Sequence, residues 1–148
     1  MIIDIPGVTE RRQSPRYALD LVLDLVLENA SMATVNTRNI SSCGLQIICD
    51  TWVTDTIEPR GIQNHSISHI RLKVIAELPI VNKDDASKNK NTVKKLYANC
   101  RIMSVRRMSQ DTYMLNLAFI SFENGSESVL DEFLDQHVQK KTVINVSA

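Results

Sequence analysis

The chain has 148 residues, with 17 basic and 17 acidic side chains and therefore a formal net charge of zero. This length suits one domain, and the zero net charge excludes a protein that is basic throughout, such as a histone-like DNA coat. The 43% hydrophobic and 23% charged residues are typical of a folded globule and not of a disordered chain. No apolar run approaches the roughly 20 residues of a membrane-spanning helix. The first nine residues do not resemble a secretory signal, so we expect a cytoplasmic protein.

The N-terminal residues 1–17 show no hydrophobic periodicity and are interrupted by proline and glycine, which predicts a flexible N-terminal arm. Residues 18–28 begin the domain, which we expect to span 18–148, and their pattern is ambiguous. Leucines alternate along them, as in a strand, while acidic residues recur every four positions, as in an amphipathic helix. The pattern alone leaves both alternatives open.

The next segments read as strands. Residues 32–38 and 45–49 are short β-like runs on either side of a turn, in which Gly44 is the candidate for a positive φ. Residues 68–81 alternate between apolar and polar side chains over most of their length, which predicts a strand with one buried face.

The last third of the chain contains two further strands and a helix. The polar segment 82–92 is expected to be a long hairpin loop. Residues 95–107 and 112–122 are predicted strands, and an apolar stripe at helical spacing predicts a helix over about 124–141.

Enzyme and metal chemistry have little support in the sequence. There is no glycine-rich phosphate loop, no GxSxG motif and no pair of carboxylates suited to acid–base work. Cys43, Cys49 and Cys100 form no CxxC pair, so we expect reduced thiols. His65 and His69 are four residues apart, but strand-like sequence begins at residue 68 and no third ligand is evident, so we expect no metal site. We therefore expect a protein without catalytic residues or cofactor.

Basic residues gather in one internal segment, from Lys83 to Arg107, which carries eight basic and two acidic side chains and hence a charge of 8 − 2 = +6. Such a segment is either a solvated loop or part of a surface for single-stranded nucleic acid. A nucleic-acid surface of that kind interleaves basic residues with stacking aromatic rings. Only Tyr97 and Tyr113 are available near this segment, so it favours the solvated loop.

Two short motifs carry the main functional signal. Arg12 and Arg16 form an RxxxR motif in the N-terminal arm, and Asn39, Ser41 and Gly44 form an NxSxxG motif at the predicted turn. In this order, and in a β-rich chain, the two motifs resemble those of the PilZ domain, a bacterial receptor domain for the second messenger cyclic di-GMP. The resemblance covers about residues 10–140. It implies a mainly β fold, a six-stranded antiparallel β-barrel with a C-terminal helix, and it favours a strand at residues 18–28.

The resemblance also implies a ligand and the residues that bind it. The guanidinium fork of arginine suits both phosphates and the O6/N7 edge of guanine, and in the PilZ family the turn motif holds a guanine. An arginine directly before RxxxR is associated in this family with an intercalated cyclic di-GMP dimer, so Arg11 implies two nucleotides per site. The predicted ligand-binding residues are Arg11, Arg12, Arg16, Asn39, Ser41 and Gly44.

The sequence therefore predicts a non-catalytic cyclic di-GMP receptor that orders its N-terminal arm on binding and signals to a partner protein. Two other classes of protein remain as alternatives. One is a PilZ-like interaction adaptor that does not bind the nucleotide, and the other is a small barrel that binds single-stranded nucleic acid.

Overall fold

The structure, a computed structural model, describes residues 15–81 and 91–147 of the chain. Within these ranges it contains seven strands and two helices. In chain order they are β1 (Tyr17–Ala18), β2 (Val22–Val26), β3 (Met32–Ile40), β4 (Gly44–Asp50), α2 (Thr51–Ile57), β5 (Arg71–Val81), β6 (Asn91–Arg107), β7 (Thr112–Glu123) and α3 (Ser126–Ser147).

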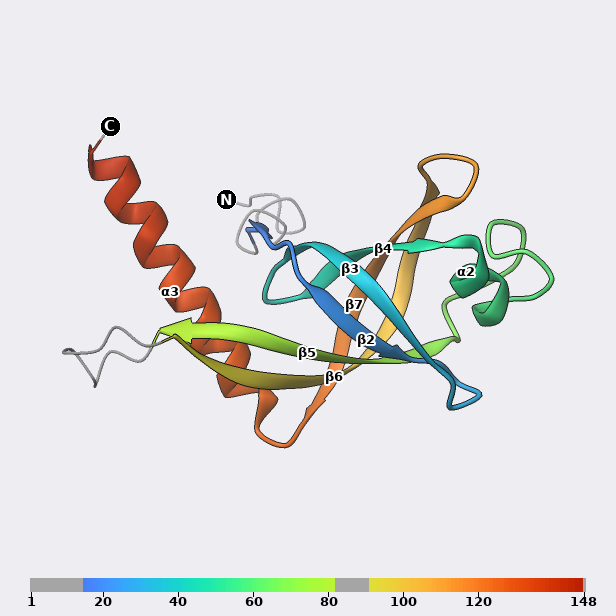
Figure 1. Cartoon of the computed structure of the whole chain (residues 1–148), viewed down its shortest axis with the longest axis horizontal. Helices are drawn as coiled ribbons and strands as arrows, with labels where there is room; N and C mark the ends of the chain where they lie inside the picture. Colours follow the sequence, from blue (N-terminus) through green and yellow to red (C-terminus); the bar gives the residue numbers. More distant parts are fainter. Residues whose placement is uncertain (1–14, 82–90, 148) are drawn as a thin grey trace, which may run out of the picture.

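Six of the strands close into a barrel. They lie in the order β3-β2-β5-β6-β7-β4, and β3 also pairs with β4, so that the sheet returns to its starting strand. Every pairing is antiparallel, and the short β1 adds to the end of β3. The closed arrangement is visible in Figure 1. The predicted six-stranded antiparallel barrel is thus confirmed, with β1 as an additional strand.

The ambiguous segment 18–28 forms β1 and β2 and no helix. In β2 the side chains of Leu23 and Leu25 point into the barrel and are 2% and 0% exposed, while Asp24 between them is half-buried on the outer face. Strand β2 is hydrogen-bonded to β3 on one side and to β5 on the other. A period of two places both leucines in the core, which a helix would not do because its period is 3.6.

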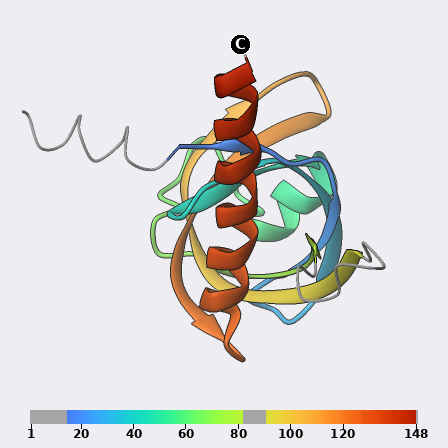
Figure 2. The same cartoon turned by 90° about the vertical axis from the view of Figure 1, so that its left-hand side faces the viewer.

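The C-terminal helix α3 covers one end of the barrel, where Leu130 and Phe133 are buried against the core. Figure 2 looks onto this end and shows the helix crossing in front of the barrel. Gln136 ties the helix to the end of β5, because its amide accepts from the backbone N–H of Val81 at 3.0 Å and donates to the carbonyl of the same residue at 2.9 Å. The predicted helix is confirmed and extends further, to Ser147.

The short helix α2, at the opposite end of the barrel, was not predicted from the sequence. Asp50 caps it by accepting a hydrogen bond from the N–H of Val53 at 3.0 Å, and the Val53 side chain is buried in the core. Beyond the helix, the carboxylate of Glu58 receives two side-chain hydrogen bonds from Arg60, at 2.7 and 3.1 Å. These bonds hold the pKa of Glu58 at about 2, well below its usual value.

The interior of the barrel contains two thiols, Cys49 and Cys100. Burial raises the pKa of each to about 12, so both stay protonated at neutral pH. No helix in residues 15–81 and 91–147 is long and apolar enough to cross a membrane.

Candidate ligand-binding site

The two sequence motifs meet on the outer face of the barrel. Strand β1 pairs with the end of β3, with Ala18 opposite Asn39, and this pairing brings the preceding Arg16 over the same strand. The Arg16 guanidinium donates a hydrogen bond to Oδ1 of Asn39 at 2.8 Å. Arg16 is exposed and Asn39 is half-buried. Arg11 and Arg12 lie outside the described residues, so Arg16 represents the arginine motif in this geometry.

Ser41 of the turn motif faces inward. Its side chain is only 1% exposed. The hydroxyl accepts hydrogen bonds from the backbone N–H groups of Cys43 at 3.1 Å and Gly44 at 3.3 Å, and it donates to the carbonyl of Gly44 at 3.3 Å. All of these bonds lie within the turn between β3 and β4, so the Ser41 hydroxyl closes this turn.

Gly44 does not have the predicted positive φ. Among the described residues, the glycines with positive φ are Gly61 and Gly125. Gly44 is required for a different reason, the close approach of β4 to β7, because a Cβ atom at this position would lie 1.9 Å from the backbone oxygen of Leu117. The glycine therefore serves the pairing of two strands that are far apart in sequence.

A row of polar side chains continues from Asn39 across the outer face, and the sequence analysis did not predict it. Asn39 donates through Nδ2 to Oε1 of Gln46. Gln46 donates to Oδ1 of Asn116 at 2.6 Å, and Asn116 donates to Oγ of Ser104 at 2.6 Å. The strand register places these four residues opposite one another on β3, β4, β7 and β6. We call Asn39, Gln46 and Asn116, ending on Ser104, the amide row.

The sequence does contain a weak signal for this row. Gln46 and Asn116 each lie between two apolar residues in their strands. These neighbours are all buried: Leu45 and Ile47 beside Gln46, and Leu115 and Leu117 beside Asn116. A lone amide in an apolar strand marks an outward position.

An open groove of about 560 Å³ lies beside Asn39 on the same outer surface. It forms where residues 19–21, between β1 and β2, run beside β3. The buried Thr37 hydroxyl fastens this segment, because its one hydrogen is shared between the carbonyls of Leu19 and Leu21 at 2.9 and 3.0 Å. The groove adjoins Asn39 through Ala18, its partner across the strand pair, and through its chain neighbour Arg38. The residues lining the groove are Ala18, Leu19, Asp20, Asn36, Thr37, Arg38 and Ile48.

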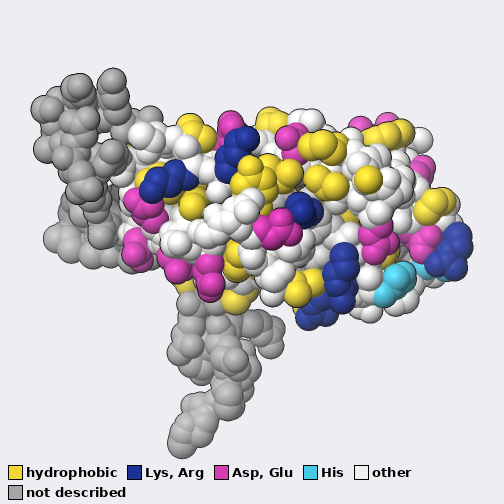
Figure 3. Space-filling view, turned by 90° about the horizontal axis from the view of Figure 1, so that it is seen from below, with side chains coloured by type: hydrophobic (Ala, Val, Ile, Leu, Met, Phe, Trp, Pro, Cys, Tyr) yellow, Lys and Arg dark blue, Asp and Glu magenta, His cyan; other side chains and the backbone are white. Residues whose placement is uncertain are grey.

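Two basic side chains of the 83–107 segment, Lys94 and Arg107, have partners. Lys94 forms an ion pair with Glu132 of α3 at 2.9 Å. Arg107 donates to two backbone carbonyls of the β6–β7 turn and lies over the ring of Tyr113, 5.7 Å from its centroid. On the face seen in Figure 3, Lys and Arg side chains are spread among Asp and Glu side chains and do not form a stripe. The distribution on this face does not favour a nucleic-acid surface there.

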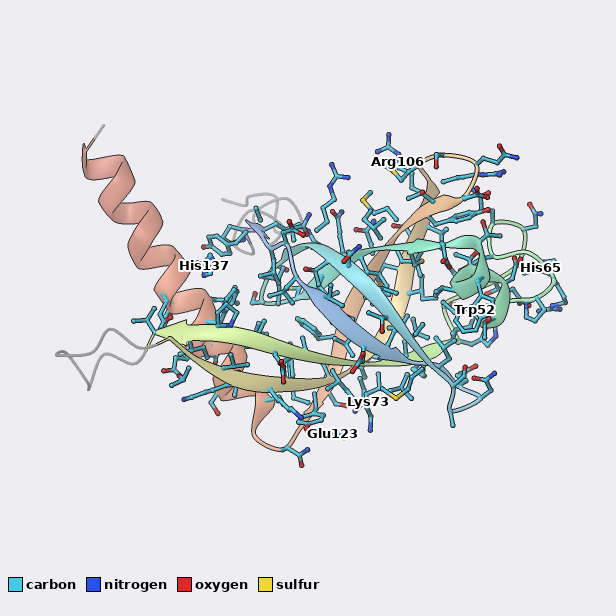
Figure 4. The ribbon with its side chains drawn as sticks, viewed as in Figure 1. Trp52, His65, Lys73, Arg106, Glu123 and His137 are labelled. Atoms are coloured by element: carbon cyan, nitrogen blue, oxygen red, sulfur yellow. The ribbon has the colours of Figure 1, made fainter. Side chains whose placement is uncertain are left out.

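Two of the three histidines, His65 and His137, lie at opposite ends of the molecule. Figure 4 places His65 near α2 and His137 on α3, and Nδ1 of His65 lies 3.1 Å from the carbonyl of Gly61. In the part of the chain that the structure describes, no group of three or more His, Cys, Asp or Glu residues could hold a metal ion.

His137 connects the arginine motif to the C-terminal helix. Its ring lies 5.8 Å from the ring of Tyr17 and 4.2 Å from the ring of Phe133, measured between centroids. Tyr17 directly follows Arg16, and Phe133 is buried where α3 meets the barrel. The ring of Tyr17 thus places the residue that follows Arg16 next to α3.

Comparisons with known proteins identify the fold. No protein-family model matches the chain, and no curated protein matches it in sequence. Solved structures that are similar in fold include the following two. The inhibitor of motility MotI/DgrA of Bacillus subtilis is 13% identical, with a TM-score of 0.58, and the match covers 89% of this chain and 52% of that one. The PlzA protein of Borreliella burgdorferi, solved in complex with c-di-GMP, is 10% identical, with a TM-score of 0.54 and coverages of 93% and 56%.

The chain thus spans about half the length of each of these two proteins. Both neighbours are PilZ-domain proteins. The matches cover 89% and 93% of the present chain. The chain therefore has a PilZ-like fold.

Proposed function

We propose that this protein is a non-catalytic receptor for cyclic di-GMP. The observation that carries the proposal is the meeting of the two motifs, in which Arg16 donates to Asn39 at 2.8 Å on the outer face of a PilZ-like barrel. One structural neighbour, PlzA, is known in complex with the same nucleotide. Because the neighbours share only the fold at 10–13% identity, the ligand is inferred mainly from the residues at this site.

The site offers the chemistry that this ligand needs. Cyclic di-GMP carries two phosphodiester charges, and the exposed Arg16 can pair with a phosphate through its planar fork. When Arg16 turns to the phosphate, Oδ1 of Asn39 becomes available to the N–H groups of a guanine. The adjoining groove gives room for the rest of the nucleotide. Arg11 and Arg12 would complete the clamp, and Ser41 and Gly44 would hold the turn that presents Asn39.

Binding would be reported to a partner protein through the N-terminal arm. Ordering of a segment around a charged ligand is a common signalling device. Here the arm continues into Tyr17, whose ring packs near His137 of α3. We infer that nucleotide binding changes the arm and the adjoining part of α3 together, and that a downstream protein in the cytoplasm recognises the changed surface.

Calorimetric titration of the purified chain with cyclic di-GMP, with GMP as the control ligand, tests the proposal. We expect saturable binding with a Kd of about 1 μM or tighter, which corresponds to about −8 kcal/mol. We expect two nucleotides per chain, because of Arg11. Arg12→Ala and Arg16→Ala should each abolish measurable binding.

The matched control is Arg71→Ala, which removes an exposed arginine on β5, away from the site, whose side chain donates to the carbonyl of Ser68 at 2.8 Å. It should bind like the parent chain. A ratio of one nucleotide per chain would support the receptor function and contradict the binding of an intercalated cyclic di-GMP dimer. No heat and no change in melting temperature on a folded sample would reject the receptor and favour the interaction adaptor.

A further inference from the structure

Strand β3 contains a β-bulge beside the candidate site, where Arg38 and Asn39 together lie opposite the single residue Gln46 of β4. Successive side chains of a regular strand point to opposite faces, so without the bulge Arg38 and Asn39 would lie on different faces. Thr37 and Ile40, on either side of this pair, are both buried, whereas Arg38 is exposed and Asn39 is half-buried. The bulge therefore turns two neighbouring polar side chains toward the outer face of the barrel.

The backbone of Arg38 is held in place, while its side chain is available to a ligand. The Arg38 carbonyl accepts a hydrogen bond from the N–H of Leu19 at 3.0 Å, which ties the bulge to the segment between β1 and β2. The guanidinium has neither a hydrogen bond nor an ion pair with any residue that the structure describes. Asp20, which lines the same groove, therefore does not neutralise it. The wall of the groove thus carries a positive charge without a fixed counter-charge.

A second guanidinium approaches the same place from another segment of the chain. Arg16 donates to the side chain of Asn39, the residue next to Arg38. Two positive charges held near each other repel, and an anion that binds to both relieves this repulsion. Each guanidinium fork matches the oxygens of one phosphate in a bidentate pair. The arrangement therefore suits a ligand that carries two phosphate charges.

We propose that Arg38 is a further ligand-binding residue, which pairs with one phosphodiester of the cyclic dinucleotide while Arg16 pairs with the other. The proposal rests on the proposed function, because it concerns the same nucleotide. It assigns a role to a residue outside both sequence motifs, and it accounts for the bulge, without which Arg38 and Asn39 would not share a face. The ligand is then held by a cation from the N-terminal arm and by one from the barrel itself.

Calorimetric titration of Arg38→Ala and Arg38→Gln with cyclic di-GMP, beside the parent chain, tests the proposal. Both variants remove the charge, and Arg38→Gln keeps most of the side chain. We expect each to bind about tenfold more weakly, the loss of one charge-assisted pair. Because salt screens such a pair, the affinity of the parent should fall more steeply than that of either variant from about 0.05 to about 0.5 M salt. The melting temperature should not change, since the side chain is exposed.

The matched control is Arg106→Ala, which removes an exposed arginine from β6, three strands from β3 in either direction around the barrel. It should bind like the parent chain, with the same salt dependence. An equal loss in Arg106→Ala and Arg38→Ala would show an effect of net charge and would overturn the proposal. Unchanged affinity in Arg38→Ala, with a parent chain that binds, would overturn it and leave the receptor function standing. If the parent chain does not bind the nucleotide, the proposed function fails and the role of Arg38 fails with it.

Discussion

The two halves of the NxSxxG motif lie in different surroundings. Asn39 is half-buried on the outer face and shares its amide between Arg16 and Gln46. Ser41 and Gly44, two and five residues further on, are buried, and both are used to close the β3–β4 turn and to pack it against β7. A short motif can thus combine an outward residue, which we propose meets the ligand, with buried residues that build its support. In this chain, changes to the two halves should separate binding from stability.

The largest effect is expected from Gly44→Ala, which tests the structural half. Its Cβ would lie 1.9 Å from the oxygen of Leu117 in the backbone of β7, so β4 and β7 must separate. We expect the free energy of unfolding to fall by about 3 kcal/mol. Denaturant unfolding measures this loss. A variant as stable as the parent chain would contradict the close approach of the two strands.

Ser41→Ala is expected to have a smaller effect of the same kind. It removes the hydroxyl that accepts from the N–H groups of Cys43 and Gly44 and leaves these donors without that acceptor. We expect a loss of about 1–2 kcal/mol in the free energy of unfolding. Binding by the fraction that remains folded should be close to that of the parent chain. A selective loss of binding at unchanged stability would instead place Ser41 in contact with the ligand.

Arg16→Lys tests the partner of Asn39, the outward half of the motif, and leaves Ser41 and Gly44 unchanged. The charge remains, but the planar fork that pairs with phosphate is lost. We expect cyclic di-GMP affinity to fall about tenfold, which is about 1.4 kcal/mol, while the unfolding transition moves by less than about 0.5 kcal/mol because the side chain is exposed. Calorimetry and thermal unfolding on the same sample measure both quantities. Full retention of affinity would show that only the charge of Arg16 matters.

The pH dependence of stability tests Glu58, which follows α2 at the opposite end of the barrel from α3. The pKa of Glu58 is lowered from 4.5 to about 2, first of all by its side-chain hydrogen bonds to Arg60. A lowered folded-state pKa stabilises the fold above pH 4.5, and this contribution disappears as the pH falls toward about 2. Glu58→Gln should therefore flatten the acid side of the stability profile over this window, as measured by unfolding at several pH values. Ser41→Ala should leave the slope unchanged, since no titrating group is removed.

The barrel itself was largely predictable from the sequence. Alternating side chains mark β5, β6 and β7, and the helical stripe marks α3, because each of these elements has one buried face. The pattern at residues 18–28 fits both a strand and a helix, because leucine is common in both. The resemblance to the PilZ domain, and not the residues themselves, favoured the strand. The helix α2 was not predicted because it spans only seven residues and contains several β-branched side chains.

The site was less predictable. The spacing of the motifs pointed to Arg16 and Asn39, whose side chains meet, but the role of Gly44 was predicted for the wrong reason. A positive φ is a local property, whereas the contact with Leu117 joins residues more than seventy positions apart. Gln46 and Asn116 were missed for the same cause, because the register of β4 against β7 depends on how the barrel closes.

Under the proposed function, the contact between Tyr17 and His137 bears on the cyclic di-GMP concentration at which the protein responds. If nucleotide binding and the state of α3 are coupled, thermodynamic linkage requires that a partner bound to α3 change the nucleotide affinity by the same factor as the nucleotide changes the partner's affinity. The cyclic di-GMP concentration at which the protein responds then depends on the partner as well as on the receptor itself. A partner that favours the nucleotide-bound state of α3 lowers that threshold, and one that favours the other state raises it.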